Sequence, residues 1–96
     1  MTDPKNSRAE CEITIRNELG LHARPAAEFV KQANSFRSEI WIVTAAGRYD
    51  ALSLIDVMRA NLNRGATARL EAVGVDAEKA VARLVDVVRQ LRDNYD

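Results

Sequence analysis

The chain has 96 residues, 47% of them hydrophobic, and its 14 Lys and Arg balance its 14 Asp and Glu. This length suits one domain that builds its own core without disulfides or metal. A net charge of zero leaves no overall field that would draw the chain to nucleic acid or to an anionic membrane, so we expect neither as a partner.

The N-terminal residues 1–8 are polar and are predicted to form a flexible lead-in to a single domain over residues 9–96. They contain no apolar core of signal-peptide length, and no later stretch approaches a membrane span, which indicates a cytoplasmic protein without membrane insertion. Cys11 is the only cysteine. It falls in an alternating apolar pattern, so we expect a buried thiol in a reducing compartment. One Cys and one His argue against a metal site, and no cofactor is predicted.

The first predicted strand carries Cys11, Ile13 and Ile15 in alternation with polar residues, the period of a half-buried strand. It leads into a turn that contains His22, the only histidine of the chain. From Ala23 to about residue 33 the apolar residues recur at helical spacing. A helix should therefore begin directly after His22.

The start of a helix offers unpaired backbone N–H groups and favours an anion, so His22 can hold a phosphoryl group there. Gly20 lets the backbone turn, and Pro25 is tolerated in a first helical turn. Arg24 adds a permanent cation whose donors suit phosphate oxygens. The other interpretation is that His22 is only a packed helix-end residue. The glycine, arginine and proline around it favour the phosphoryl site.

Residues 38–44 are rich in β-branched and aromatic residues and are predicted to form a hairpin with residues 48–51. Trp41 falls on the side of this hairpin away from the helices. There it either packs across strands, the commoner case, or docks a partner. Ser53 is expected to cap a short helix that ends near residue 60, with Asp56 as a capping-box acid.

A turn at residues 61–65 precedes the last predicted strand, residues 66–73, and Asp76 is expected to cap the final and longest helix. The order βαββαβα, with hairpins and no long crossovers, predicts an α+β fold: a mainly antiparallel four-stranded sheet with three helices on one face. The buried stripe of the final helix is predicted to consist of Ala77, Val81, Leu84, Val88 and Leu91.

The segment Gly20 to Ala26 resembles the active-site segment of the histidine-containing phosphocarrier proteins, the HPr family of the bacterial phosphoenolpyruvate-dependent phosphotransferase system. Residues 49–58 resemble the family's second-helix segment and residues 65–74 its last strand. The resemblance implies an HPr-like open-faced β-sandwich. It also implies that His22 accepts a phosphoryl group at Nδ1 from enzyme I and passes it to EIIA proteins, with Arg24 holding the phosphate.

The side-chain chemistry is consistent with such a carrier. Neutral imidazole has a free nitrogen near physiological pH, and a phosphoimidazole is reactive enough to pass its phosphoryl group on. The sequence shows no acid–base dyad, so catalysis must be shared with partner proteins. We therefore expect a stoichiometric carrier rather than an enzyme. We also expect a monomer.

In some HPr lineages the serine equivalent to Ser53 is phosphorylated by an ATP-dependent HPr kinase/phosphorylase. Ser53 is therefore either a regulatory phosphoserine or simply a helix cap, and both interpretations stay open. The family also docks partners through an apolar patch beside its histidine. Here that patch is predicted to consist of Ala27, Lys31, Leu54, Ile55 and Met58. A core position is plausible for Ile55 and less so for Leu54 and Met58.

Other functions remain open beside sugar transport and its regulation. The run Asn17 to Gly20 also resembles the nitrogen-related branch of the same system, in which the chemistry is the same and the partners differ. A regulatory HPr-like module, controlled at Ser53 and bound to a transcriptional regulator, is a second alternative, although the presence of both His22 and Arg24 argues against it. A hydrolase with His22 as base lacks a nucleophile and ranks last.

Overall fold

The computed structural model describes residues 7–93, and its seven elements follow one another in the predicted order. The strand β1 begins at Arg8, a residue that the sequence placed in the lead-in, and residues 1–6 of that lead-in lie outside the described part. The elements are β1 (Arg8–Thr14), α1 (Ala23–Ala33), β2 (Ser38–Thr44), β3 (Gly47–Asp50), α2 (Leu54–Arg59), β4 (Thr67–Gly74) and α3 (Ala77–Arg89).

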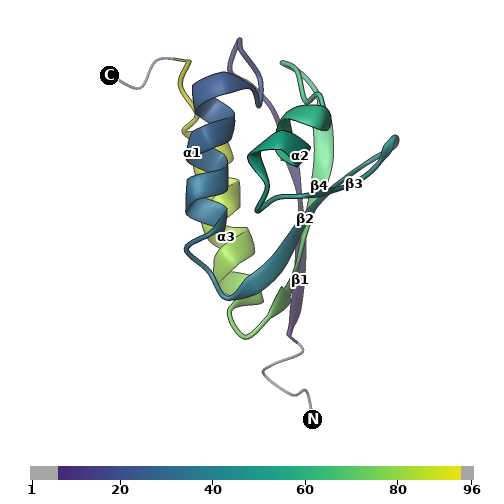
Figure 1. The fold of residues 1–96 in the computed structure, drawn as a ribbon, viewed down its shortest axis with the longest axis vertical. Coiled ribbons are helices and arrows are strands. Elements are labelled where there is room, and N and C mark those ends of the chain that lie inside the picture. The colour runs from purple at the N-terminus through teal and green to yellow at the C-terminus, as the bar shows by residue number, and fades with distance from the viewer. Residues whose placement is uncertain (1–6, 94–96) are drawn as a thin grey trace.

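The four strands form one antiparallel sheet in the spatial order β1-β4-β2-β3, so β1 and β3 are its edges. Leu70 at the centre of β4 pairs with Cys11 of β1 on one side and with Ile42 of β2 on the other. Helices α1 and α3 pack against each other, α3 lies along the sheet, and α2 lies between α1 and β3 (Figure 1). The expected α+β architecture is confirmed.

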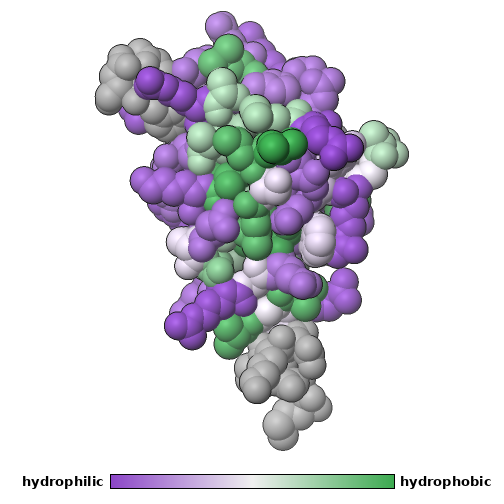
Figure 2. Space-filling model, in the orientation of Figure 1, coloured by the Kyte–Doolittle hydropathy of each residue, from purple (hydrophilic) through white to green (hydrophobic). Residues whose placement is uncertain are grey.

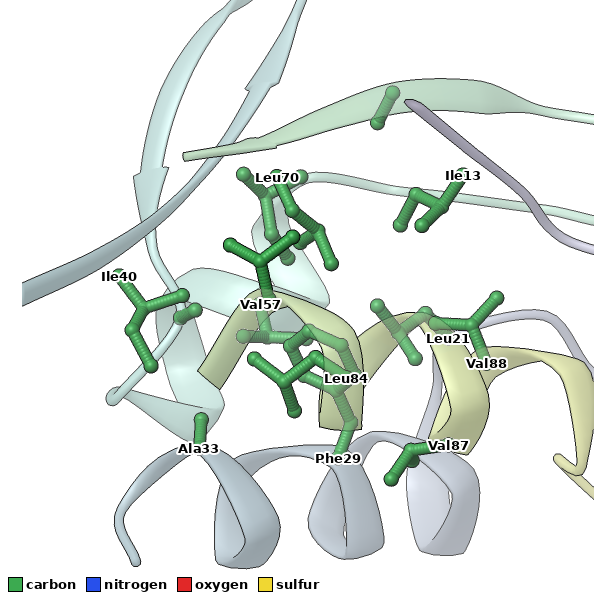
Figure 3. Packing of buried hydrophobic residues seen from close by; sticks show 14 of the residues in the cluster. Ile13, Leu21, Phe29, Ala33, Ile40, Val57, Leu70, Leu84, Val87 and Val88 are labelled. Carbon is green, nitrogen blue, oxygen red and sulfur yellow. The ribbon is translucent and has the colours of Figure 1, made fainter. Parts of the chain in front are cut away.

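The core lies between this sheet and the helices because side chains alternate along each strand and only one face is covered. Ile40, Ile42 and Leu70 point to the covered face and are fully buried, as are Phe29 of α1 and Leu84 of α3. Figure 3 shows the Phe29 and Leu84 side chains facing each other beneath Leu70. The core therefore anchors α1, the helix that directly follows His22.

The other face of the sheet is open and carries Trp41. The Arg48 guanidinium of the neighbouring strand lies 3.9 Å from the centre of the indole ring, which is a cation–π contact. Packing across the strands, the commoner of the two interpretations of Trp41, is confirmed.

The prediction of a buried thiol is wrong, because Cys11 is exposed. Ile13 and Ile15, which share its alternation, are buried as expected. The difference arises at the edge of the sheet, since β1 has a neighbouring strand on one side only. The alternation predicted which face of β1 points to the core. It did not show that the helices leave the Cys11 end of this face exposed.

Two acidic residues that were predicted to cap helices bind elsewhere. Asp76 stands at the start of α3, but its carboxylate accepts hydrogen bonds from Ser38 Oγ at 2.6 Å and from the backbone N–H of Arg37 at 2.9 Å. The Asp56 carboxylate accepts from the backbone N–H of Asp50 at 2.8 Å. Each acid thus joins its helix to a preceding segment, a tertiary role that local spacing does not predict.

Ser53 stands at the start of α2 and Leu91 follows the end of α3. The Ser53 cap of α2 is confirmed, because its Oγ accepts from the Asp56 N–H at 3.3 Å. Leu91, predicted in the stripe of the last helix, lies beyond the end of α3 and packs half-buried against the core.

Candidate functional site

His22 stands at the N-cap of α1, half-buried, with extended backbone angles of φ −130° and ψ 163°. Its carbonyl oxygen accepts the first helical hydrogen bond, from the Ala26 N–H at 3.3 Å. The preceding residue, Leu21, is fully buried and donates its N–H to the Leu62 carbonyl oxygen at 2.8 Å. The backbone of His22 is therefore held on both sides.

A second segment, residues 61–66, packs against the chain that leads to His22. Gly65 donates its N–H to the Ile15 carbonyl oxygen at 2.7 Å, and Ile15 donates to Ala66 at 2.9 Å. Gly20 has a φ of +71°, and a Cβ on it would collide with the Leu62 carbonyl oxygen. Glycine is required here both by its backbone angle and by the closeness of the two segments.

The close packing brings an amide side chain to the imidazole. His22 Nε2 lies 2.9 Å from Asn63 Oδ1, within hydrogen-bond distance. From the sequence, Asn63 is only a turn residue. It comes 41 positions after His22, and no spacing rule connects a turn amide with a ring so far away in the chain.

The turn before His22 is also fastened to the segment that follows α3. Asn17 Nδ2 donates to the Gly20 carbonyl oxygen at 2.9 Å and to Asp93 Oδ1 at 3.0 Å, and the Leu19 N–H donates to the same Asp93 oxygen at 2.9 Å. The hydrogen bond from Leu19, followed by that from Asn17, holds the pKa of Asp93 below its ordinary value. The Asp93 carboxylate thus joins the end of the described chain to the turn before the histidine.

The first turn of α1 follows directly and suits an anion. Ala23 has a φ of +50°, a left-handed conformation that costs a non-glycine residue roughly 1–2 kcal/mol. Arg24 is exposed two positions after His22, and Pro25, the third residue of the helix, is buried. No acidic residue lies in this turn. A phosphoryl group on His22 would therefore lie at a helix N-terminus without a neighbouring carboxylate in that turn.

The predicted docking residues lie on two helices that contact each other. Ala27 and Lys31 are exposed on α1. On α2 the exposed fraction is 38% for Leu54, 36% for Met58 and 69% for Ile55. Figure 2 shows hydrophobic side chains exposed along the middle of the face on which α1 and α2 lie.

The interpretation of Ile55 as a core residue is wrong, since it is the most exposed of the three apolar side chains. Val57 is the fully buried residue of α2 instead. With only six residues in the helix, this single buried side chain anchors it to the core.

Ser53 is half-buried beside this apolar surface. Its hydroxyl oxygen accepts the Asp56 N–H, while the Asp56 carboxylate is engaged by the Asp50 N–H. Ser53 therefore has a structural role as the cap of α2.

Two further findings concern residues 7–93 alone. None of their helices combines the length and the apolar character that crossing a bilayer requires. Nor do three or more His, Cys, Asp or Glu side chains come together in that range in a way that could hold a metal ion.

The chain is similar to a known protein family over most of its length. Residues 9–90 match the family model described as the PTS HPr component phosphorylation site. Proteins named phosphocarrier protein HPr are similar over most of their length: the chain is 37% identical to that of Vibrio cholerae over 82 residues, which are 85% of this chain and 96% of the relative. It is 39% identical to that of Haemophilus influenzae over 80 residues, 83% of this chain and 94% of the relative.

Solved structures agree with this likeness. An HPr structure from Thermoanaerobacter tengcongensis superposes with a TM-score of 0.82 at 40% identity, covering 84% of this chain and 91% of the other. HPr from Bacillus anthracis gives a TM-score of 0.81 at 30% identity, covering 85% and 98%. The catabolite repression protein Crh of Bacillus subtilis, described as a swapped dimer, gives 0.70 at 32% identity, covering 81% and 90%.

Proposed function

Because this chain belongs to the HPr family of phosphocarrier proteins, we propose that His22 is the residue that carries the phosphoryl group. One observation carries the proposal: the only histidine of the chain stands at the N-cap of α1. It lies inside the match to a family model that is described by its phosphorylation site. The helix N-terminus and the absence of acidic residues in its first turn support a bound anion there.

The proposed reaction is a transfer between histidines. The lone pair of His22 Nδ1 attacks the phosphorus of the phosphohistidine of enzyme I, a new N–P bond forms, and the old N–P bond breaks with its electron pair returning to the donor ring. The same exchange then passes the group to a histidine of an EIIA protein. Arg24 holds the phosphate oxygens during both steps, since a guanidinium binds them with two parallel hydrogen bonds.

We propose that partners dock on an apolar surface formed by Ala27, Lys31, Leu54, Ile55 and Met58. Three apolar side chains exposed on one short helix are unusual unless they meet a partner. Met58 suits a surface that must fit more than one partner, since its side chain is flexible and polarizable. Lys31 adds a charge at the rim, where charge raises the association rate.

We further propose that Ser53 is a regulatory phosphorylation site for an HPr kinase/phosphorylase and that a transcriptional regulator binds the phosphorylated form. The location of Ser53 immediately before Leu54 supports this, because a phosphate there would place negative charge beside the docking surface. To separate phosphorylation from capping, the protein is incubated with ATP and the kinase. Ser53→Asn keeps a capping oxygen and is expected to lose the acid-stable phosphate. A phosphate that survives in this variant rules out Ser53.

The branch of the system, the compartment and the oligomeric state belong to the same proposal. We propose the sugar branch as the leading case and the nitrogen branch as its rival; comparing kcat/KM for this chain with the enzyme I of each branch decides between them. We also propose a cytoplasmic monomer. Similar structures include a swapped dimer of Crh and an HPr dimer from Thermoanaerobacter tengcongensis, so the mass in solution has to be measured.

The decisive experiment incubates the protein with phosphoenolpyruvate and enzyme I and reads the intact mass. The wild type is expected to gain an acid-labile phosphoryl group, and His22→Ala is expected to gain none. Circular dichroism of His22→Ala checks that the variant is folded. The absence of an adduct on the wild type, or an undiminished adduct on His22→Ala, would contradict the proposal.

A further inference from the structure

The hydrogen bond between His22 and Asn63 determines which ring nitrogen is free to react. A neutral imidazole has one N–H and one nitrogen with a free lone pair. The amide oxygen of Asn63 can only accept, so Nε2, 2.9 Å away, must donate to it. The lone pair then resides on Nδ1. We propose that Asn63 is a positioning residue that fixes this tautomer of His22 and so makes Nδ1 the nucleophile; the inference rests on the proposed phosphocarrier function of His22.

The backbone around Asn63 gives its side chain a fixed place. The neighbouring Leu62 carbonyl accepts the Leu21 N–H, one residue before His22. The Asn63 carbonyl accepts the Ala66 N–H at 2.9 Å, which closes the turn. A Cβ on Gly20 would lie only 2.9 Å from Asn63 Cα, so the two segments are in close contact. The amide therefore approaches the ring from a segment that is hydrogen-bonded to the histidine turn itself.

This tautomer removes a proton transfer from the reaction. If Nδ1 carried the proton, it would have to lose it before it could attack phosphorus. With the proton on Nε2, the Nδ1 lone pair forms the N–P bond directly, and the ring becomes a phosphoimidazolium that keeps its Nε2–H. When the group moves on, the N–P electron pair returns to Nδ1 and neutral imidazole leaves. The Nε2–H stays in place through both steps.

An amide suits this position better than a carboxylate would. A carboxylate beside Nε2 would stabilise the doubly protonated ring, whose Nδ1 cannot attack. The charged groups on the segments that meet around His22 are mixed in sign: Arg24 in the first turn of α1, Arg64 next to Asn63, Glu18 in the turn before the histidine, and Asp93 after α3. Arg64 and Glu18 face each other at 3.9 Å and are both largely exposed. The hydrogen-bond partner of the ring, the Asn63 amide, is itself neutral.

The first test uses the unphosphorylated protein and therefore does not depend on the proposed function. Nitrogen-15 NMR of the His22 ring, at a pH where it is neutral, is expected to show Nε2 protonated and Nδ1 unprotonated. In Asn63→Ala both nitrogens are expected to shift toward the average of the two tautomers. A wild-type ring protonated at Nδ1, or ring signals that Asn63→Ala leaves unchanged, overturns the inference.

The second test measures phosphorylation by phosphoenolpyruvate and enzyme I against pH. In Asn63→Ala the reactive tautomer is expected to fall from nearly all to about half of the neutral ring, which should slow phosphorylation about twofold at neutral pH. In Asn63→Asp the pH below which the rate falls is expected to move up by about one unit or more. Asn61→Asp, an exposed position in the same turn, adds the same charge away from the ring and is the matched control. An unmoved profile in Asn63→Asp, or an equal shift in Asn61→Asp, contradicts the inference.

The two proposals fail in different ways. If His22→Ala is still phosphorylated, the phosphocarrier role of His22 fails while the tautomer seen by NMR stands. If His22→Ala loses the phosphate but the Asn63 variants match the wild type in both NMR and pH profile, the carrier role stands and the role of Asn63 fails.

Discussion

Gly20 is the residue on which the geometry of the histidine turn depends most directly. We expect Gly20→Ala to lower the free energy of unfolding by about 2–4 kcal/mol, because it combines a left-handed backbone with a collision against the Leu62 carbonyl. Gly65→Ala is the control: its φ is +90° but a Cβ there meets nothing within 4 Å, so it should cost only about 1–2 kcal/mol. Urea unfolding of both variants measures the difference. Equal losses would mean that the close contact of the two segments contributes nothing.

Residues also differ in how far the sequence reveals their roles. His22 and Arg24 could be selected because a helix start, a glycine and a proline lie within a few positions of them. Asn63 could not, since its role arises only when the segment before β4 folds back onto the turn before α1. Asp76 shows the same limit, because its place before a helix predicted a cap, whereas its actual partners, Arg37 and Ser38, lie where the α1–β2 connection meets β2.

At the scale of elements, the apolar periodicity of the sequence predicted the long helices and the strands. For the short helix α2 it predicted the position but not every buried residue. The helix α1 spans Ala23–Ala33 as its apolar spacing indicated, and β2, β3 and β4 lie within one residue of their predicted bounds. The strand β1 begins at Arg8 and ends at Thr14, so it starts before the predicted alternation and does not include Ile15. Helix α2 was placed correctly, but its apolar pattern left open whether Ile55 belonged to the core or to the docking surface. A helix of six residues completes fewer than two turns, so its apolar pattern contains too few positions to define a stripe.

On α2, Ile55 is exposed and Val57 is fully buried, and this difference gives a prediction about docking. We expect Ile55→Ser to weaken phosphoryl transfer to EIIA about tenfold through a higher KM, because it removes apolar area from the docking surface. Since Ile55 is 69% exposed, the free energy of unfolding should change by less than about 0.5 kcal/mol. Val57→Ala is the matched control on the same helix: fully buried, it should cost about 1–3 kcal/mol in stability. Its KM should stay near that of the wild type at temperatures where it is folded. If Ile55→Ser leaves KM unchanged, α2 is not the docking surface.

At the scale of the whole molecule, two carboxylates connect segments that lie far apart in the sequence. Asp76 joins the start of α3 to the connection between α1 and β2, and Asp93 joins the segment after α3 to the turn before His22. Burial by itself would raise the pKa of Asp76, but the hydrogen bonds from Ser38 and Arg37 outweigh it and lower the pKa below its ordinary value. The pKa of Asp93 is lowered as well. Protonation of either acid at low pH is therefore expected to lower the free energy of unfolding.

The sign of this coupling follows from proton binding. A carboxyl whose pKa is lower in the folded than in the unfolded chain binds fewer protons when folded, so folding is favoured above its ordinary pKa of about 4. We therefore expect the free energy of unfolding to be nearly constant from neutral pH down to about pH 5. Below about pH 4 it should fall as protons compete with Ser38 and Arg37 for Asp76. Urea titrations at a series of pH values measure this dependence.

Asp76→Asn tests whether the hydrogen-bonded carboxylate is responsible. The variant keeps one acceptor oxygen and has no charge to titrate, so it should be less stable than the wild type at neutral pH and lose less stability in acid. The two curves should thus converge as the pH falls below about 4. Glu39→Gln, an exposed position on β2, removes the same charge without breaking these hydrogen bonds and must keep the wild-type slope. Parallel curves for Asp76→Asn and the wild type would show that the connection between α3 and the α1–β2 segment does not depend on the charge of Asp76.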